Sequence, residues 1–176
     1  MTYANFWRRF GAFWVDFIVL IPMMVIAYYG SRHSRLFHLY WLIPSTLIGI
    51  WFHVHLVTRY GGTPGKLALR TKIVMIDGSP ITKSAAFLRF SVLLVLTFAG
   101  SIALCMASLK ITDEQYLSLT FTQQSHALIS MAPSWYTPVS IALQIWIWSE
   151  FITILFNKKR RAIHDFIAKT VVIRTS

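Results

Sequence analysis

Four long apolar stretches, separated by polar segments, make up most of the chain. They cover residues 12–29, 38–57, 87–108 and 136–156. Each is about 20 residues long, which is the length of an α-helix that crosses the roughly 30 Å hydrocarbon layer of a bilayer. The pattern predicts an all-α membrane protein with four transmembrane helices, in which residues 1–176 form a single domain. An even number of crossings places both ends of the chain on the same side of the membrane.

The composition supports this class. Of the 176 residues, 56% are hydrophobic and 13% are charged, whereas soluble domains carry about 25% charged residues. A soluble domain of this length could not remove so much apolar sequence from water. The net charge of +11 does not indicate a nucleic-acid-binding surface, because the basic residues lie in the gaps between the apolar stretches. The expected partner is the lipid bilayer, and no nucleic acid is expected.

The basic residues also predict the orientation. Fourteen of the 17 lysines and arginines lie before the first stretch, from Arg59 to Arg89, or in the tail, and three lie in the other two gaps. Lysine and arginine are enriched in cytoplasmic loops. Both termini (N-in, C-in), the connection 58–86 and the tail 157–176 are therefore predicted to be cytoplasmic, and the protein to be a multi-pass protein of the cell (inner) membrane.

The connection 58–86 and the tail contain signs of ordered structure. The β-branched run 72–76 stops at Asp77-Gly78, a dipeptide typical of hairpin turns. A second short run of this type covers residues 170–173. Because both segments are predicted on the same side of the membrane, we expect small ordered cytoplasmic elements in which these two runs pair.

Asp16 is the first polar residue that calls for an explanation, because it lies inside the first apolar stretch. An acidic side chain within a membrane helix costs roughly 2.5 to 3.5 kcal/mol, so it should face protein or water and have a partner. Arg9 is the first candidate. The two residues fall on the same face of a helix, about 10 Å apart along its axis, so they can share a groove but can touch only if the helix bends.

Other polar residues are predicted to lie at the same depth. If the first helix enters from the cytoplasm and the second and fourth return to it, then Asp16, His53 and Glu150 all lie in the inner half of the bilayer, with Asp165 at its mouth. Carboxylates and imidazole at one depth favour a site that binds a cation or relays protons. The alternative is structural: Arg9, Arg89 or arginines of the tail neutralise these acids as salt bridges.

Several chemistries lack support in the sequence. The segment GGTPGK resembles a phosphate-binding loop, but it is one residue too short and lacks the hydroxyl that holds magnesium. No nucleophile-base arrangement, metal-ligand spacing or cofactor fingerprint is present. We therefore expect no enzyme activity, no catalytic residues, no metal and no cofactor. A basic cluster follows the fourth stretch and favours anionic lipids at the cytoplasmic face or a topology signal: Lys158, Lys159, Arg160 and Arg161.

Three blocks, in this order, carry a family resemblance: RRFGAFWVD at 8–16, GGTPGKLALRTKIVMIDG at 61–78 and KKRRAIHDFIAKTVVI at 158–173. With Phe87-Leu88-Arg89 between them, they resemble the RDD family of membrane proteins, which is named for one arginine and two aspartates. The resemblance assigns the arginine to Arg9 and the aspartates to Asp16 and Asp165. The chain departs from the family pattern at three positions, with Arg70 and Lys169 where glycine is frequent and Lys72 where arginine is usual.

The resemblance implies little about activity beyond the association of some members with monovalent cation/proton exchange. We therefore carry two hypotheses. In the first, the chain is a small transporter that exchanges cations for protons through Asp16, His53, Glu150 and Asp165, and it forms a homo-oligomer because four helices can scarcely enclose a pathway. In the second, it is a non-transporting scaffold or accessory subunit with a membrane-protein hetero-partner.

Overall fold

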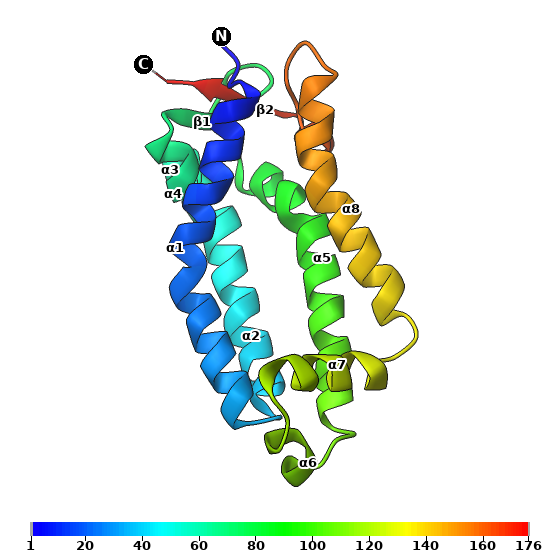
Figure 1. Ribbon diagram of the computed structural model, residues 1–176. Helices are drawn as coiled ribbons and strands as arrows, with labels where there is room; N and C mark the ends of the chain where they lie inside the picture. Colours follow the sequence, from blue (N-terminus) through cyan, green and yellow to red (C-terminus); the bar gives the residue numbers. More distant parts are fainter. Residues whose placement is uncertain (1, 176) are drawn as a thin grey trace.

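The computed structural model describes residues 2–175, and most of them are helical (Figure 1). Four helical segments are long and apolar enough to cross a membrane: Phe6–His33, Phe37–Ala68, Lys83–Ser108 and Tyr136–Leu155. The prediction of a largely helical protein with four membrane-spanning segments is confirmed. The side of the membrane on which the termini lie stays a prediction.

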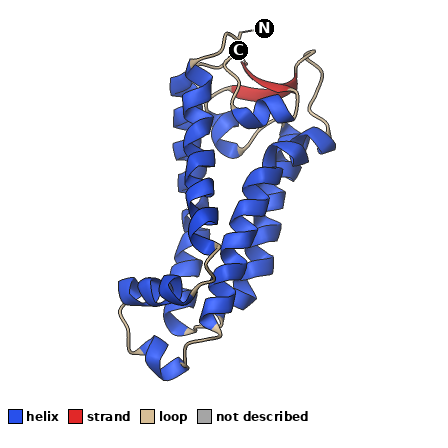
Figure 2. Ribbon diagram, turned by 90° about the vertical axis from the view of Figure 1, so that its right-hand side faces the viewer, coloured by secondary structure: helices blue, strands red, loops and turns tan. Residues whose placement is uncertain are grey.

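The four segments form a closed bundle. Helix α1 (Phe6–His33) packs against α2 (Phe37–Ile50), α2 against α5 (Lys83–Ser108), α5 against α8 (Tyr136–Leu155), and α8 against α1. Large apolar side chains such as Val95 and Ile145 are more than 60% exposed on its outer surface, as expected where lipid takes the place of water. Both chain termini lie at one end, which we call the terminal end, and we call the opposite end the distal end (Figures 1 and 2).

The first helix starts six residues before the predicted stretch and ends four residues after it. Asn5 caps it, with its side-chain oxygen accepting a hydrogen bond from the backbone N–H of Arg8 at 3.0 Å. Its 28 residues give a length of about 42 Å, which exceeds the hydrocarbon thickness. The basic first turns of α1 are therefore part of the helix and not a loop before it.

The second span contains a π-helical turn near the terminal end. Helix α2 passes into a π-helical turn, η1 (Trp51–His55), and then into α3 (Leu56–Tyr60), which stops at Gly61 with φ +81°. A left-handed residue ends a helix most readily when it is glycine. The chain then turns back through the short helix α4 (Pro64–Ala68), which packs against α1.

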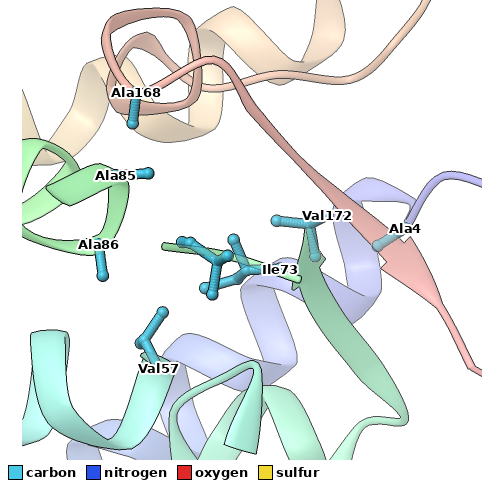
Figure 3. Close-up of a cluster of buried hydrophobic side chains, with 8 residues drawn as sticks. Ala4, Val57, Ile73, Ala85, Ala86, Ala168 and Val172 are labelled. Atoms are coloured by element: carbon cyan, nitrogen blue, oxygen red, sulfur yellow. The ribbon is translucent and has the colours of Figure 1, made fainter. Parts of the chain in front are cut away.

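Two short strands cover the terminal end. Strands β1 (Thr71–Met75) and β2 (Thr170–Arg174) pair antiparallel, with Ile73 opposite Val172. This confirms the pairing predicted for the two β-branched runs. A cluster of small buried apolar side chains lies beneath them, and Figure 3 shows Ile73 and Val172 pointing into it beside Val57, Ala85 and Ala86. The cluster fixes the strands to α3 and α5, since two strands alone are marginally stable.

Two further helices at the distal end were not predicted: α6 (Asp113–Leu117) and α7 (Phe121–Met131). Both begin with a capping box, Thr112 with Gln115 and Thr120 with Gln123, a sequence signal of helix starts. The hydroxyl of Tyr116 donates to the carbonyl of Ser31 at 2.8 Å and so ties α6 to the end of α1. Helix α7 lies across the bundle near its distal end (Figure 1).

Candidate functional site

A buried carboxylate lies at the centre of the terminal end. Asp165 belongs to α9 (Ile163–Ile167), is 0% exposed, and accepts four hydrogen bonds. Arg9 Nη1 (2.9 Å) and the backbone N–H of Ala162 (3.0 Å) donate to Oδ2. Arg89 Nη1 and Thr170 Oγ1 (3.1 Å) donate to Oδ1. Since Arg9 comes from α1 and Arg89 from α5, this carboxylate ties the tail to the first and third spans.

The charge of Asp165 is held by its surroundings. Burial on its own would raise the pKa of this carboxyl, but the Arg89 guanidinium, and with it that of Arg9, outweighs burial and holds the pKa of Asp165 well below its usual range. The side chain is therefore an anion at neutral pH. These contacts favour the structural interpretation for Asp165, because a carboxylate clamped by two guanidinium groups does not readily exchange protons.

Asp16 has other partners than the one expected. Its Oδ2 accepts from Thr63 Oγ1 at 2.5 Å, and its Oδ1 accepts from the backbone N–H of Gly65 at 2.7 Å. The expectation that Arg9 pairs with Asp16 is wrong: Arg9 lies two helical turns away along the axis and pairs with Asp165, which is nearer in space. Residue 65 must be glycine for this contact, because a Cβ there would overlap the carbonyl oxygen of Ala12.

Glu150 and His164 form a second polar pair. His164 Nδ1 lies 2.8 Å from Glu150 Oε1, and its Nε2 lies 2.7 Å from Arg89 Nη2. A guanidinium nitrogen can only donate, so Nε2 must accept and the imidazole proton must lie on Nδ1, where it is donated to Glu150. This tautomer is assigned from the partners. A proton arriving at Nε2 would therefore break the contact between His164 and Arg89.

These groups surround one cavity. Its volume is about 270 Å³, and it lies within the bundle near the terminal end. Its lining combines apolar side chains from α1, α5 and α8 with seven titratable or charged ones: Arg9, Asp16, His53, Lys66, Arg89, Glu150 and His164. Asp165 does not line the cavity but binds two residues that do. Three of the four predicted cluster residues, Asp16, His53 and Glu150, therefore meet at one space.

The π-helical turn η1 carries His53, one of the two histidines that line the cavity. The His53 ring stacks on the Phe90 ring of α5 with centroids 4.7 Å apart, while His55 is exposed. Of His53 and His55, only His53 lines the cavity. A single π-helical turn within a longer helix is frequent at functional sites. Within residues 2–175, no group of three or more His, Cys, Asp and Glu side chains is arranged to hold a metal ion.

Sequence reasoning missed Lys66 and Thr63. Both belong to the segment around α4, in which the sequence analysis assigned no site residue. Lys66 lines the cavity, and in the described part of the chain its ammonium group makes no hydrogen bond or ion pair. The available signal was the position of Asp16: an acid within an apolar helix needs a donor, and the backbone N–H groups at the start of a turn of helix can supply one.

The basic cluster after α8 does not act as a unit. Lys158 and Arg160 line a pocket on the surface of the terminal end, and Lys159 is exposed beside it. Arg161 turns inward, with its guanidinium carbon 3.9 Å from the centre of the Phe166 ring. One of the four residues is therefore a packing residue, and the other three remain available to solvent or lipid head groups.

Comparison with known proteins gives one match. A model of the RDD family covers residues 3–169 of the chain, a range that includes Arg9, Asp16, Asp165 and every side chain that lines the cavity. Neither the curated proteins nor the solved structures contain a match.

Proposed function

We propose that this chain, which belongs to the RDD family of multi-pass membrane proteins, exchanges monovalent cations for protons through the cavity at its terminal end. The observation that carries the proposal is the lining of that cavity, in which Asp16, Glu150 and Lys66 occur together among apolar side chains of the helices. Ionisable side chains inside membrane helices are costly, and they mark ion pathways and proton relays. Neither Asp16 nor Glu150 is bound by an arginine.

The balance of charges around the cavity supports coupling between the two ions. Three acids, one of them just behind the lining, face three bases: Asp16, Glu150 and Asp165 against Arg9, Lys66 and Arg89. With neutral histidines the net charge is zero. A monovalent cation bound between the carboxylates would add an uncompensated buried charge, which costs several kcal/mol. The loss of one proton from the cluster removes that cost, so binding of the cation and release of the proton occur together.

Lys66 is the group that we expect to release the proton. The two arginines remain protonated in a protein, whereas a lysine can lose its proton. Lys66 also has no hydrogen-bond partner within residues 2–175 that would hold it in place. One cation then replaces one proton, and the exchange carries no net charge.

The distribution of basic residues sets the proposed orientation, and the number of spans sets the proposed assembly. Because most lysines and arginines lie at the terminal end, we propose that this end and both termini face the cytoplasm of a cell (inner) membrane. The cavity then opens toward the cytoplasm. A single copy has only four spans, so we propose that a homo-oligomer completes the pathway to the other side.

The test is cation flux in proteoliposomes under an imposed pH gradient, with Na⁺, K⁺ and Li⁺ in turn. The native chain should show saturable flux that does not respond to a clamped membrane potential. Glu150→Gln and Asp16→Asn should abolish it. Lys66→Arg is the sharpest variant, because it keeps the positive charge but removes the exchangeable proton. Glu114→Gln, an exposed acid at the distal end, is the matched control and should leave the flux unchanged.

The opposite result would remove the proposal. If the native chain moves none of the three cations against a pH gradient, or if Lys66→Arg exchanges at the native rate, the cavity is not a coupled exchange site. All variants must first give the same unfolding temperature within a few degrees, so that lost flux is not lost folding.

A second candidate function is a scaffold or accessory subunit, and the clamp on Asp165 favours it. Two buried ion pairs that join α1, α5 and the tail are what a structural role for the family's arginine and aspartate requires. This hypothesis predicts a stable hetero-partner in the membrane and no ion coupling. Mild detergent extraction followed by mass spectrometry of the co-purifying proteins distinguishes it from the transporter.

A further inference from the structure

A basic pocket opens on the surface of the terminal end, apart from the polar cavity inside the bundle. Its volume is about 360 Å³. Three separate parts of the chain line it: the start of α1 with Asn5 and Arg8, the segment after α8 with Lys158 and Arg160, and the end of β2 with Arg174. Within residues 2–175, its lining contains these four basic side chains and no acidic one. Such a concave basic site favours an anionic ligand.

The basic side chains are free to bind a ligand. Those of Lys158, Arg160 and Arg174 make no hydrogen bond or ion pair within the described residues, and all three are exposed. Arg8 is half-buried and donates from Nη1 to the carbonyl oxygen of Leu69 at 2.7 Å, which holds the guanidinium in one position. The remaining donors of Arg8 are left for a ligand. Guanidinium groups bind phosphate oxygens strongly and often in pairs.

The position of the pocket identifies the source of the phosphate. It lies where α1 begins and just after α8 ends at Leu155, two helices that contact each other. The rings of Phe6 in α1 and Phe151 in α8 contact each other edge to face near these helix ends, with centroids 6.3 Å apart. Beside the pocket, Trp7 is 73% and Phe156 is 83% exposed. Exposed aromatic residues at the ends of spans lie at the level of lipid head groups.

We propose that this pocket binds the head-group phosphate of an anionic phospholipid, whose acyl chains run along the apolar outer surface of α1 and α8. The site does not depend on the exchange activity of the cavity. It also divides the basic cluster after α8: Lys158 and Arg160 are ligands, whereas their neighbour Lys159 contributes only diffuse charge. Diffuse attraction would treat all three alike, so the neighbours provide a direct test.

The experiment is native mass spectrometry of the detergent-purified chain, titrated with phosphatidylglycerol or with phosphatidylcholine of the same acyl chains. The native chain should bind one phosphatidylglycerol, at least tenfold more tightly than phosphatidylcholine. A charge-assisted hydrogen bond to a phosphate oxygen contributes about fivefold or more to binding. Lys158→Gln with Arg160→Gln should weaken binding roughly 25-fold, and Arg174→Gln alone roughly fivefold. If the double variant fails to fold, Arg174→Gln decides, since its side chain is exposed.

The control is Lys83→Gln with Lys159→Gln, which removes the same charge from exposed positions at the same end of the bundle. It should change binding less than twofold. Equal losses in the two double variants would overturn the proposal, because they would indicate attraction by net charge alone. So would equal affinity for phosphatidylcholine. If inorganic phosphate or glycerol phosphate competes at the same concentration as phosphatidylglycerol, the ligand is a soluble phosphate and not a lipid.

Discussion

Replacing Asp165 with asparagine tests the central contact of the terminal end. The native carboxylate gives one oxygen to Arg9 and the N–H of Ala162, and the other to Arg89 and Thr170. An asparagine has one oxygen and one NH₂ group. Whichever way the amide turns, its NH₂ faces a guanidinium and a second donor, and both arginines lose their counterion. Removing one partner of a buried ion pair costs about 3 to 5 kcal/mol.

The expected loss of unfolding free energy is a large share of the total stability, since proteins are stable by about 5 to 15 kcal/mol. Unfolding of Asp165→Asn by sodium dodecyl sulfate in mixed micelles, followed by circular dichroism, measures it. Asp113→Asn is the control: Asp113 pairs with Arg35 at 2.6 Å, but its side chain is 66% exposed, so the loss should stay below about 1 kcal/mol.

Two results would refute this account of Asp165. One is a loss of less than about 1 kcal/mol. The other is strict additivity with Arg9→Met, because removing an arginine should cost less once its counterion is already gone.

Three further predictions concern the same end of the protein. Because the pKa of Asp165 is lowered on folding, its stabilising effect is complete above about pH 5 and fades as pH falls below about 4, the pKa of an unfolded aspartate; the difference in unfolding free energy between native and Asp165→Asn chains should therefore be constant above about pH 5 and shrink between about pH 4 and pH 2. Gly65→Ala should cost more than about 2 kcal/mol in the same unfolding assay, since the new methyl group meets the Ala12 carbonyl oxygen, and a change below 0.5 kcal/mol would contradict the close approach of α4 to α1. Arg70→Gly should raise stability by about 0.5 to 1 kcal/mol, because Arg70 has φ +52°, whereas Arg59→Gly within α3 should lower it by about 1 kcal/mol.

The departures from the family pattern have a backbone explanation. Arg70 and Lys169 occupy positions where glycine is frequent in the family, and both adopt φ +52°. Glycine takes this conformation without cost, while other residues lose roughly 1 to 2 kcal/mol. The two turns therefore adopt in this chain the left-handed conformation that glycine favours.

The spans and the strand pair could be predicted because their signals are local. Hydropathy over about 20 residues identifies a membrane helix, and β-branched runs such as 170–173 indicate a strand. Helix positions were less well predicted at their ends, since Asn5 caps α1 well before the apolar stretch begins. The helices α6 and α7 could not be predicted from hydropathy because their segment is short and polar, and only the capping boxes at Thr112 and Thr120 indicate them.

The partners of the polar residues could not be predicted in the same way. A helical wheel places Asp16 and Arg9 on one face, but it contains no residue from other elements. Arg9 pairs with Asp165, which is 156 residues away in the sequence, and Asp16 pairs with the turn at Thr63. That Asp16, His53 and Glu150 lie at a similar depth could be inferred from the directions in which the helices cross. Contacts that depend on how α4 and α9 fold back against the bundle could not.

The clamp on Asp165 also has a consequence for biosynthesis. Arg9 is made at the start of translation, and its counterion Asp165 is made only near the end, after all four spans have been synthesised. At 5 to 20 residues per second, the 156 residues that separate them take roughly 8 to 30 seconds to synthesise. During this interval the inserted chain carries an unneutralised arginine near the membrane surface. A chain truncated after the fourth span would lack Asp165 and leave this charge without its counterion.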